Sequence, residues 1–162
     1  SDIDFLFQLM NDTKIMKALN EPPTSKEDWI KAVNYWENDD DELDFIIWND
    51  DKQIGWFAFN GVQSPDKIVY LKMAAILPQY QHKGIGSYVL LQLLEVMKRK
   101  GFVKVILFTN QENVTAQKCY QKCGFRIIEE LTEKMSDNTL AVRFKMECDL
   151  LGKRLITFLN DL

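Results

Sequence analysis

The 162-residue sequence is poor in cysteine and histidine, and these shortages exclude several kinds of site. Its cysteines, Cys119, Cys123 and Cys148, are odd in number and lack the spacing of a disulfide framework. Because the chain has a single histidine, they also lack the partners of a zinc site. We therefore expect no metal, and we expect buried thiols in the reducing environment of the cytoplasm.

Long apolar runs and basic stripes are also missing. No stretch approaches the roughly 20 apolar residues that cross a bilayer. The opening SDIDFLFQLM has neither the basic region nor the cleavage site of a signal peptide. The formal net charge is −4, whereas a protein that binds DNA or RNA usually presents a basic stripe. We expect a soluble protein with no nucleic-acid partner and no membrane partner.

Hydrophobic residues make up 46% of the chain, which suits one globular domain, residues 1–162, with its own core. Apolar residues at helical spacing predict a helix over residues 2–19, broken near Asn11. No repeat, low-complexity tract or linker divides the sequence.

A second helix is predicted after two prolines, because Thr24 and Glu27 have the spacing of a capping box. Its expected buried face consists of Trp29, Ile30, Val33 and either Tyr35 or Trp36. An acidic run over residues 37–44 follows. We interpret it as a solvated loop, with the alternative that it steers a cationic acceptor.

Short β-branched and aromatic segments predict the strands. The segment 103–109 follows a helix and is almost continuously apolar, which favours a buried strand in parallel pairing. The expected fold class is therefore mixed α/β, with a central, mainly antiparallel sheet and one parallel pair. The predicted strands are 44–49, 53–60, 68–77, 103–109, 125–131 and 139–150; the helix 113–123 stops at Gly124, and 151–162 is a short helix or an extra strand.

The segment from Gln79 to Gly101 places two glycines directly before a strongly apolar helix. The first turn of a helix has free backbone N–H groups and a positive dipole end, so an anion can bind there if side chains stand aside. Gly84 and Gly86 would allow that approach, and Gln81, His82 and Lys83 add donors at the same rim. The alternative is a turn that uses glycine only for its geometry.

Two well-known phosphate loops do not fit this segment. A dinucleotide fingerprint requires glycine where Val89 stands, and no Gly-Lys-Ser/Thr sequence of a Walker loop is present. Instead, the order of QHKGIG at 81–86, NVTA at 113–116 and YQKCGF at 120–125 resembles the GNAT superfamily of N-acetyltransferases. Both family motifs are matched in order and spacing.

The resemblance implies acetyl-CoA as cofactor and an acetyltransferase fold. Residues 1–36 would form the acceptor side, 44–149 the cofactor-binding core and 150–162 a tail. The pyrophosphate of coenzyme A would lie on the loop amides, and the pantetheine arm would pair with the strand before the loop. The implied cofactor-binding residues are Ala74, Ile76, Gln81, His82, Lys83, Gly84, Ile85, Gly86, Ser87 and Asn113.

The resemblance makes Tyr120 the catalytic residue. A departing thiolate needs a proton, and a phenol close to the sulfur can supply it as general acid. A free backbone N–H near Ile76 would stabilise the charge on the carbonyl oxygen. The alternative is that Tyr120 only packs on the inner face of its helix. His82 as the base is a disfavoured alternative, because the resemblance implies that this loop position faces the cofactor phosphates. Direct transfer is favoured over an acyl-Cys119 intermediate because no histidine is placed to activate the thiol.

The chain departs from the family pattern in two places. Many members have a glutamate on the strand before the loop, but YLKMAAILP at 70–78 contains no carboxylate. A non-catalytic acyl-CoA-binding module is therefore an alternative function, and a plain interaction domain is a third. The family's first strand also has no counterpart before SDIDFLF. Either the sequence is trimmed, or residues 151–162 or a second subunit of a homodimer fill that edge of the sheet.

The expected acceptor is a small-molecule or peptide amine. At pH 7 a lysine amine needs about 4.6 kcal/mol to become neutral, whereas an α-amine needs only about 1 to 1.4 kcal/mol. Without an obvious base, an α-amine is the easier substrate. The TSKEDW segment at 24–29 is similar to relatives of ribosomal-protein alanine acetyltransferases, which favours a protein N-terminus, with polyamines, amino acids and aminoglycosides as alternatives.

Overall fold

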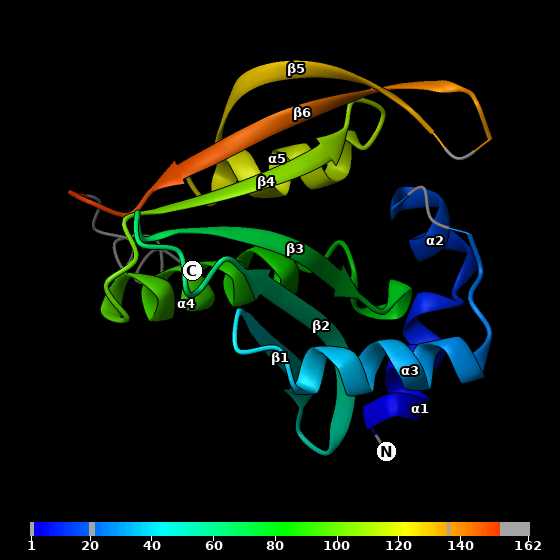
Figure 1. The fold of residues 1–162 in the computed structure, drawn as a ribbon. Coiled ribbons are helices and arrows are strands. Elements are labelled where there is room, and N and C mark those ends of the chain that lie inside the picture. Colours follow the sequence, from blue (N-terminus) through cyan, green and yellow to red (C-terminus); the bar gives the residue numbers. More distant parts are fainter. Residues whose placement is uncertain (1, 20–21, 136, 153–162) are drawn as a thin grey trace.

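The computed structural model describes residues 2–19, 22–135 and 137–152. Six strands form one mixed sheet with helices on both faces (Figure 1). The helices are α1 (Asp2–Met10), α2 (Thr13–Leu19), α3 (Lys26–Glu37), α4 (Ile85–Arg99), α5 (Val114–Lys122) and the 3₁₀ turn η1 (Pro78–Tyr80). The strands are β1 (Glu42–Asn49), β2 (Lys52–Asn60), β3 (Ile68–Ile76), β4 (Lys104–Asn110), β5 (Arg126–Lys134) and β6 (Leu140–Asp149).

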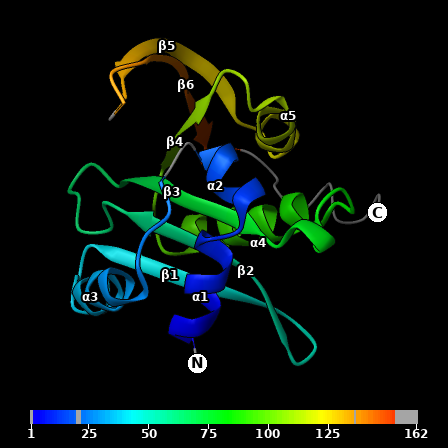
Figure 2. The ribbon, with the colours of Figure 1, turned by 90° about the vertical axis from the view of Figure 1, so that its right-hand side faces the viewer.

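The strand order is β1-β2-β3-β4-β6-β5, and every pair is antiparallel except β3 with β4. This confirms the predicted fold class. Successive side chains of β2 point to opposite faces of the sheet and pack into two hydrophobic cores. Trp56 packs with α1 and α3, whereas Phe57 packs with α4. Figure 2 shows α3 on one side of the sheet and α4 with α5 on the other.

Helices α1 to α3 agree with the prediction except in two respects, which are the capping residue and the buried face of α3. The predicted break near Asn11 is confirmed, since α1 ends at Met10 and α2 begins at Thr13. The capping residue of α3 is Ser25, not Thr24: its hydroxyl accepts the Asp28 amide at 3.2 Å and donates to the Asp28 carboxylate at 2.7 Å. The N-cap therefore lies one position later than predicted, and the Ser25 hydroxyl satisfies the free Asp28 amide.

The buried face of α3 is narrower than predicted. Trp29 and Val33 are buried and Trp36 is half-buried, but Ile30 is 38% exposed and Tyr35 is 70% exposed. The buried positions are separated by four and then three residues, so they lie on one face of the helix. Ile30 and Tyr35 lie beside that face and point outward.

Three carboxylates of the acidic run are held by the sheet and its loops. Asp41 accepts the amides of Gly61 and Gln63 at 3.1 and 2.7 Å, and Asp44 accepts the Trp56 indole N–H at 2.7 Å. The Glu42 carboxylate, 8% exposed, pairs with Lys72. These partners give the run a structural role, so part of it is not the solvated loop that we expected.

The parallel pair of β3 and β4 is short, and the sheet opens where the pairing ends. β3 and β4 pair only from Ile68–Lys104 to Tyr70–Ile106, after which the two strands separate. Figure 1 shows the two halves of the sheet diverging from this point, with α2 beside the open end. The far ends of both strands therefore leave backbone groups facing the space between them.

Gly55 on β2 is needed for close packing behind this opening. A Cβ added there would lie 2.5 Å from the Ile76 Cδ1 and 2.7 Å from the Ala75 carbonyl oxygen. We expect Gly55→Ala to lower the free energy of unfolding by about 1 to 3 kcal/mol, because β2 and β3 must shift apart. Urea denaturation measures this change. Gly86→Ala is the matched control, because its added Cβ meets only the Cys119 sulfur, at 4.0 Å; equal losses in both variants would contradict the steric argument.

The remaining predictions concern absences and the tail. No helix among the described residues is long and apolar enough to cross a membrane. The described part of the chain also holds no group of three or more His, Cys, Asp or Glu side chains that could bind a metal ion. Most of the predicted tail element, residues 153–162, lies outside the described residues.

Candidate functional site

A cleft of about 540 Å³ opens where β3 and β4 separate. Its walls come from β3, the loop before α4, the inner face of α5, the end of β4 and α2. Nine of the eleven residues predicted for the site line it: Ala74, Ile76, Gln81, His82, Gly84, Gly86, Ser87, Asn113 and Tyr120. Lys83 and Ile85 do not line it: the Lys83 ammonium lies 5.8 Å from the centre of the Tyr80 ring, and Ile85 packs against the core.

The loop before α4 is shaped by two left-handed residues, His82 with φ 58° and Gly84 with φ 77°. Gly84 is the N-cap of α4 and has no side chain to satisfy the amides of the first turn. An added Cβ at Gly84 would meet nothing within 4 Å, so glycine is needed there for its backbone conformation. The first-turn amides border the cleft without a covering side chain, which fits an anion such as a phosphate.

The end of β3 presents backbone groups to the cleft. The Leu77 amide donates to the Ile54 carbonyl of β2 at 2.8 Å. Because successive amides of a strand point to opposite sides, those of Ala74 and Ile76 point toward the separated strand β4. The Gln81 side chain donates to the Ile76 carbonyl at 2.8 Å, which ties the loop to the strand. The geometry therefore suits pairing of an extended ligand arm along β3.

Tyr120 lies on α5 with its ring 5.9 Å from that of Phe125. Burial raises the pKa of the Tyr120 phenol well above its ordinary value, and the neighbouring Cys119 and Cys123 thiols raise it further. The phenol therefore keeps its proton at neutral pH. It carries a proton that it can donate into the cleft, and the raised pKa makes it a weaker acid than a free tyrosine.

Asn113 also has a structural function. It is the N-cap of α5, where its side-chain oxygen accepts the Ala116 amide at 3.2 Å. Its side-chain nitrogen donates a long hydrogen bond of 3.5 Å to the Ala18 carbonyl at the end of α2. Asn113 thus fixes the start of α5 and links it to α2 at the cleft.

A pair of thiols borders the loop from α5. The Cys119 sulfur lies 3.2 Å from the Ser87 hydroxyl oxygen, and the buried Cys123 thiol donates to the Ser87 carbonyl at 3.5 Å. Hydrogen bonds from Cys123 and Ser87, with the charge of Lys122, lower the pKa of Cys119 to about 6 although burial opposes this shift. The predicted burial holds for Cys123 and Cys148, whereas Cys119 is half-buried and faces the cleft.

The low pKa gives a test of this geometry. We expect alkylation of Cys119 by iodoacetamide to speed up as pH rises through about 6 and then to level off, because the thiolate is the reactive form. Peptide mass spectrometry measures the modified fraction, and Cys119→Ser identifies the site. Acetyl-CoA should protect the thiol. A midpoint near the ordinary value of about 8.5 would contradict the lowered pKa.

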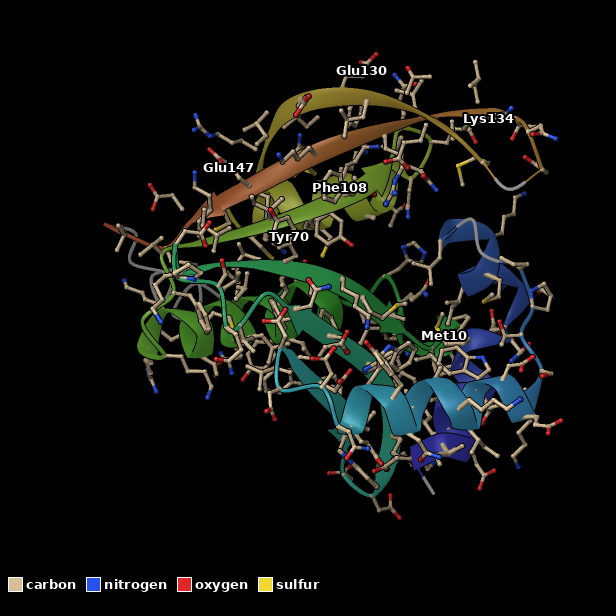
Figure 3. The ribbon with its side chains drawn as sticks, in the orientation of Figure 1. Met10, Tyr70, Phe108, Glu130, Lys134 and Glu147 are labelled. Carbon is tan, nitrogen blue, oxygen red and sulfur yellow. The ribbon has the colours of Figure 1, made fainter. Side chains whose placement is uncertain are left out.

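The sequence reading missed the contributions of α2 and β4 to the cleft. Ile15 and Ala18 of α2 line it, and Phe108 of β4, labelled in Figure 3, does so from the other half of the sheet. The apolar face of α2 was visible in the sequence, but its position between the two halves depends on the tertiary fold. Among the described residues, the Lys, Arg, His, Asp and Glu side chains that line the cleft are all basic: Lys14, His82, Lys118 and Lys122.

The family model described as the acetyltransferase (GNAT) family matches residues 3–125. The chain belongs to this family. N-alpha-acetyltransferase 30 of Schizosaccharomyces pombe is 28% identical over 132 residues, which cover 80% of this chain and 85% of that protein. Spermidine N(1)-acetyltransferase of Thermoplasma acidophilum is 26% identical over 103 residues, which cover 64% of this chain and 62% of that enzyme.

Solved structures share the fold. The spermidine N-acetyltransferase of Vibrio cholerae in complex with CoA and spermine has a TM-score of 0.81 at 21% identity, over 92% of this chain and 90% of that one. AAC(6')-Ib with ribostamycin and coenzyme A has a TM-score of 0.73 at 17% identity, over 91% and 88%. This GNAT protein is an N-acetyltransferase that moves an acetyl group from acetyl-CoA to a primary amine. The predicted family, enzyme class and cofactor are confirmed.

Proposed function

We propose that this acetyltransferase uses the cleft between β3 and β4 to bind acetyl-CoA and transfers the acetyl group directly to an α-amine. The observation that carries the proposal is the convergence of nine predicted residues, from segments distant in sequence, on one cleft. A turn that used glycine only for geometry would not require Tyr120 and Asn113 to face the same space.

The loop Gln81–Ser87 is proposed to bind the phosphates. Its amides lie at the positive end of the α4 dipole, and His82 and two lysines of α5 line the same cleft. Ala74 and Ile76 would pair with the extended arm through their inward-facing backbone groups. Lys83 and Ile85 belong to the same loop but do not line the cleft, so their predicted part in binding stays a prediction. Acetyl-CoA supplies the activated thioester when it is bound.

Tyr120 is proposed to be the general acid. Its buried phenol stays protonated at neutral pH and can donate its proton to the departing thiolate. The amide of Ile76, which points into the cleft, is placed to stabilise negative charge on the carbonyl oxygen. Tyr120 and Ile76 both line the cleft, so the departing sulfur and the carbonyl oxygen would each have a hydrogen-bond partner.

The acceptor is proposed to be an α-amine of a peptide or small molecule. No carboxylate is among the described residues that line the cleft, and we propose that a water molecule takes the proton from the amine. An α-amine, with a pKa of about 7.7 to 8.0, loses its proton far more easily than a lysine amine. The relative named N-alpha-acetyltransferase 30 supports this choice.

We also propose a cytoplasmic location and a homodimer. The three cysteines have no disulfide spacing, which suits a reducing compartment. β5 is an edge strand with Ile127 and Ile128 each 42% exposed, a surface that a second copy of the chain could cover. Analytical ultracentrifugation measures the mass in solution, and a monomer at all concentrations would contradict the dimer.

The function is tested by thiol release from acetyl-CoA with a panel of peptides, amino acids and polyamines. We expect release to depend on both protein and amine, and mass spectrometry should find the acetyl group on the amine nitrogen. Coenzyme A binding without release on any amine would instead favour a non-catalytic acyl-CoA-binding module.

A further inference from the structure

A second cavity, also of about 540 Å³, adjoins the cleft on the side of α2. The two spaces share Lys14, Ala18, Asn110 and Asn113, so they meet at the end of β4. The second cavity is bounded by α2, the connection from β4 to α5, and the first residues of β6. A molecule held there would reach the cleft beside Asn113.

The second cavity has a basic wall. Lys14 and Lys17 line it from exposed positions one helical turn apart on α2. Glu112 is the one carboxylate among its described lining residues. The nearby Asp12 carboxylate accepts the amides of Lys14 and Ile15 at 2.9 and 3.2 Å. The remaining lining is neutral: the side chains of Asn110, Gln111 and Asn113 and the apolar residues Ala18, Leu140, Ala141 and Val142.

We propose that this second cavity binds a carboxylate of the acceptor, so that the enzyme acts on an amine that also carries a carboxylate, an amino acid, rather than on a polyamine. The inference rests on the proposed acetyl transfer at the cleft. Lys14 and Lys17 are the residues that determine this specificity. Their ammonium groups supply charge-assisted hydrogen bonds to a carboxylate, and the amide side chains beside them supply further donors.

The same charges act on the amine itself. A positive charge near an ammonium group lowers its pKa, so a basic wall increases the neutral fraction of the acceptor. The carboxylate of an amino acid raises the pKa of its own amine, and pairing that carboxylate with Lys14 and Lys17 offsets part of this rise. A polyamine carries further positive charges, and each would be repelled by Lys14, Lys17 and the basic residues of the cleft.

The acceptors named for two similar proteins differ from this expectation. The Vibrio cholerae enzyme was crystallised with spermine, and the Thermoplasma acidophilum relative is named for spermidine. Their identities of 21% and 26% to this chain leave room for a different lining. A basic wall repels a polycation. We therefore expect this protein to act on a different class of substrate from those enzymes.

The test compares three acetylated probes by calorimetry with protein saturated with coenzyme A. N-acetylalanine and N-ethylacetamide differ only in a carboxylate, and N1-acetylspermidine is cationic. We expect N-acetylalanine to bind at least about tenfold more tightly than either of the others. The double variant Lys14→Met, Lys17→Met should lose that preference. The control Lys31→Met removes a similar charge from an exposed site on α3 and should keep it.

Each outcome decides the inference. Tighter binding of N1-acetylspermidine, equal binding of N-acetylalanine and N-ethylacetamide, no binding of any probe, or a preference that survives in the double variant overturns it. Thiol release in the same preparations separates this failure from that of the proposed function. If release depends on Tyr120 but the carboxylate preference is absent, only the inference fails. If coenzyme A itself does not bind, both fail.

Discussion

Tyr120→Phe is expected to lower the rate of thiol release by about 100-fold or more, with little change in the affinity for acetyl-CoA. The substitution removes one hydroxyl and keeps the ring that packs against Phe125. The buried phenol holds its proton at neutral pH, so removing the Tyr120 hydroxyl removes the proton donor for the departing thiolate. The cost should therefore fall on kcat rather than on binding.

Stopped assays with a thiol reagent measure the rate, and calorimetry measures the affinity for coenzyme A. Tyr88→Phe is the matched control, because Tyr88 lies on α4, is 50% exposed and does not line the cleft. A Tyr120→Phe enzyme with the rate of the wild type would show that the ring only packs. A large loss of folding stability in Tyr120→Phe would also count against the role of general acid, because partial unfolding would then explain the lower rate.

Gly86→Asp is expected to weaken acetyl-CoA binding by about 100-fold or more, because a carboxylate would stand in the first turn of α4 where phosphates are proposed to bind. The fold should tolerate the change. An added Cβ at Gly86 meets only the Cys119 sulfur, at 4.0 Å. An acidic residue in the first turn of a helix is also favourable for the helix dipole.

Gly86→Asn separates charge from size, since its side chain has nearly the same shape without the charge. We expect Gly86→Asn to bind acetyl-CoA more tightly than Gly86→Asp, and both variants to unfold near the temperature of the wild type. Unchanged affinity in Gly86→Asp would mean that the phosphates lie elsewhere. Unfolding of both variants would mean that Gly86 serves the fold.

Local patterns were sufficient to predict most of the elements and much of the cleft. The β1–β2 hairpin, the parallel strand β4 and the break between α1 and α2 follow from turn residues, apolar runs and helical spacing. The cleft residues on β3, the loop and α5 follow from two motifs whose spacing matches a family. The error at Ser25 has a local cause, because Thr24 and Ser25 can both cap a helix and sequence alone does not rank them.

Features that depend on tertiary placement could not be predicted. The sequence shows that α2 is amphipathic, but not that its Lys14 and Ala18 border two cavities. The role of Gly55 depends on how closely the Ile76 side chain approaches from β3. The acidic run was predicted to be a solvated loop, because its partners Gly61, Lys72 and Trp56 are distant in sequence.

The most direct test of the central claim is isothermal titration of acetyl-CoA into the wild-type protein. The cleft between β3 and β4 should bind one molecule per chain, with a dissociation constant on the order of 1 to 100 μM. Prior alkylation of Cys119, which lines the same cleft, should abolish the signal. Absence of binding, or binding unaffected by a bulky group on Cys119, would contradict the assignment of this cleft to acetyl-CoA.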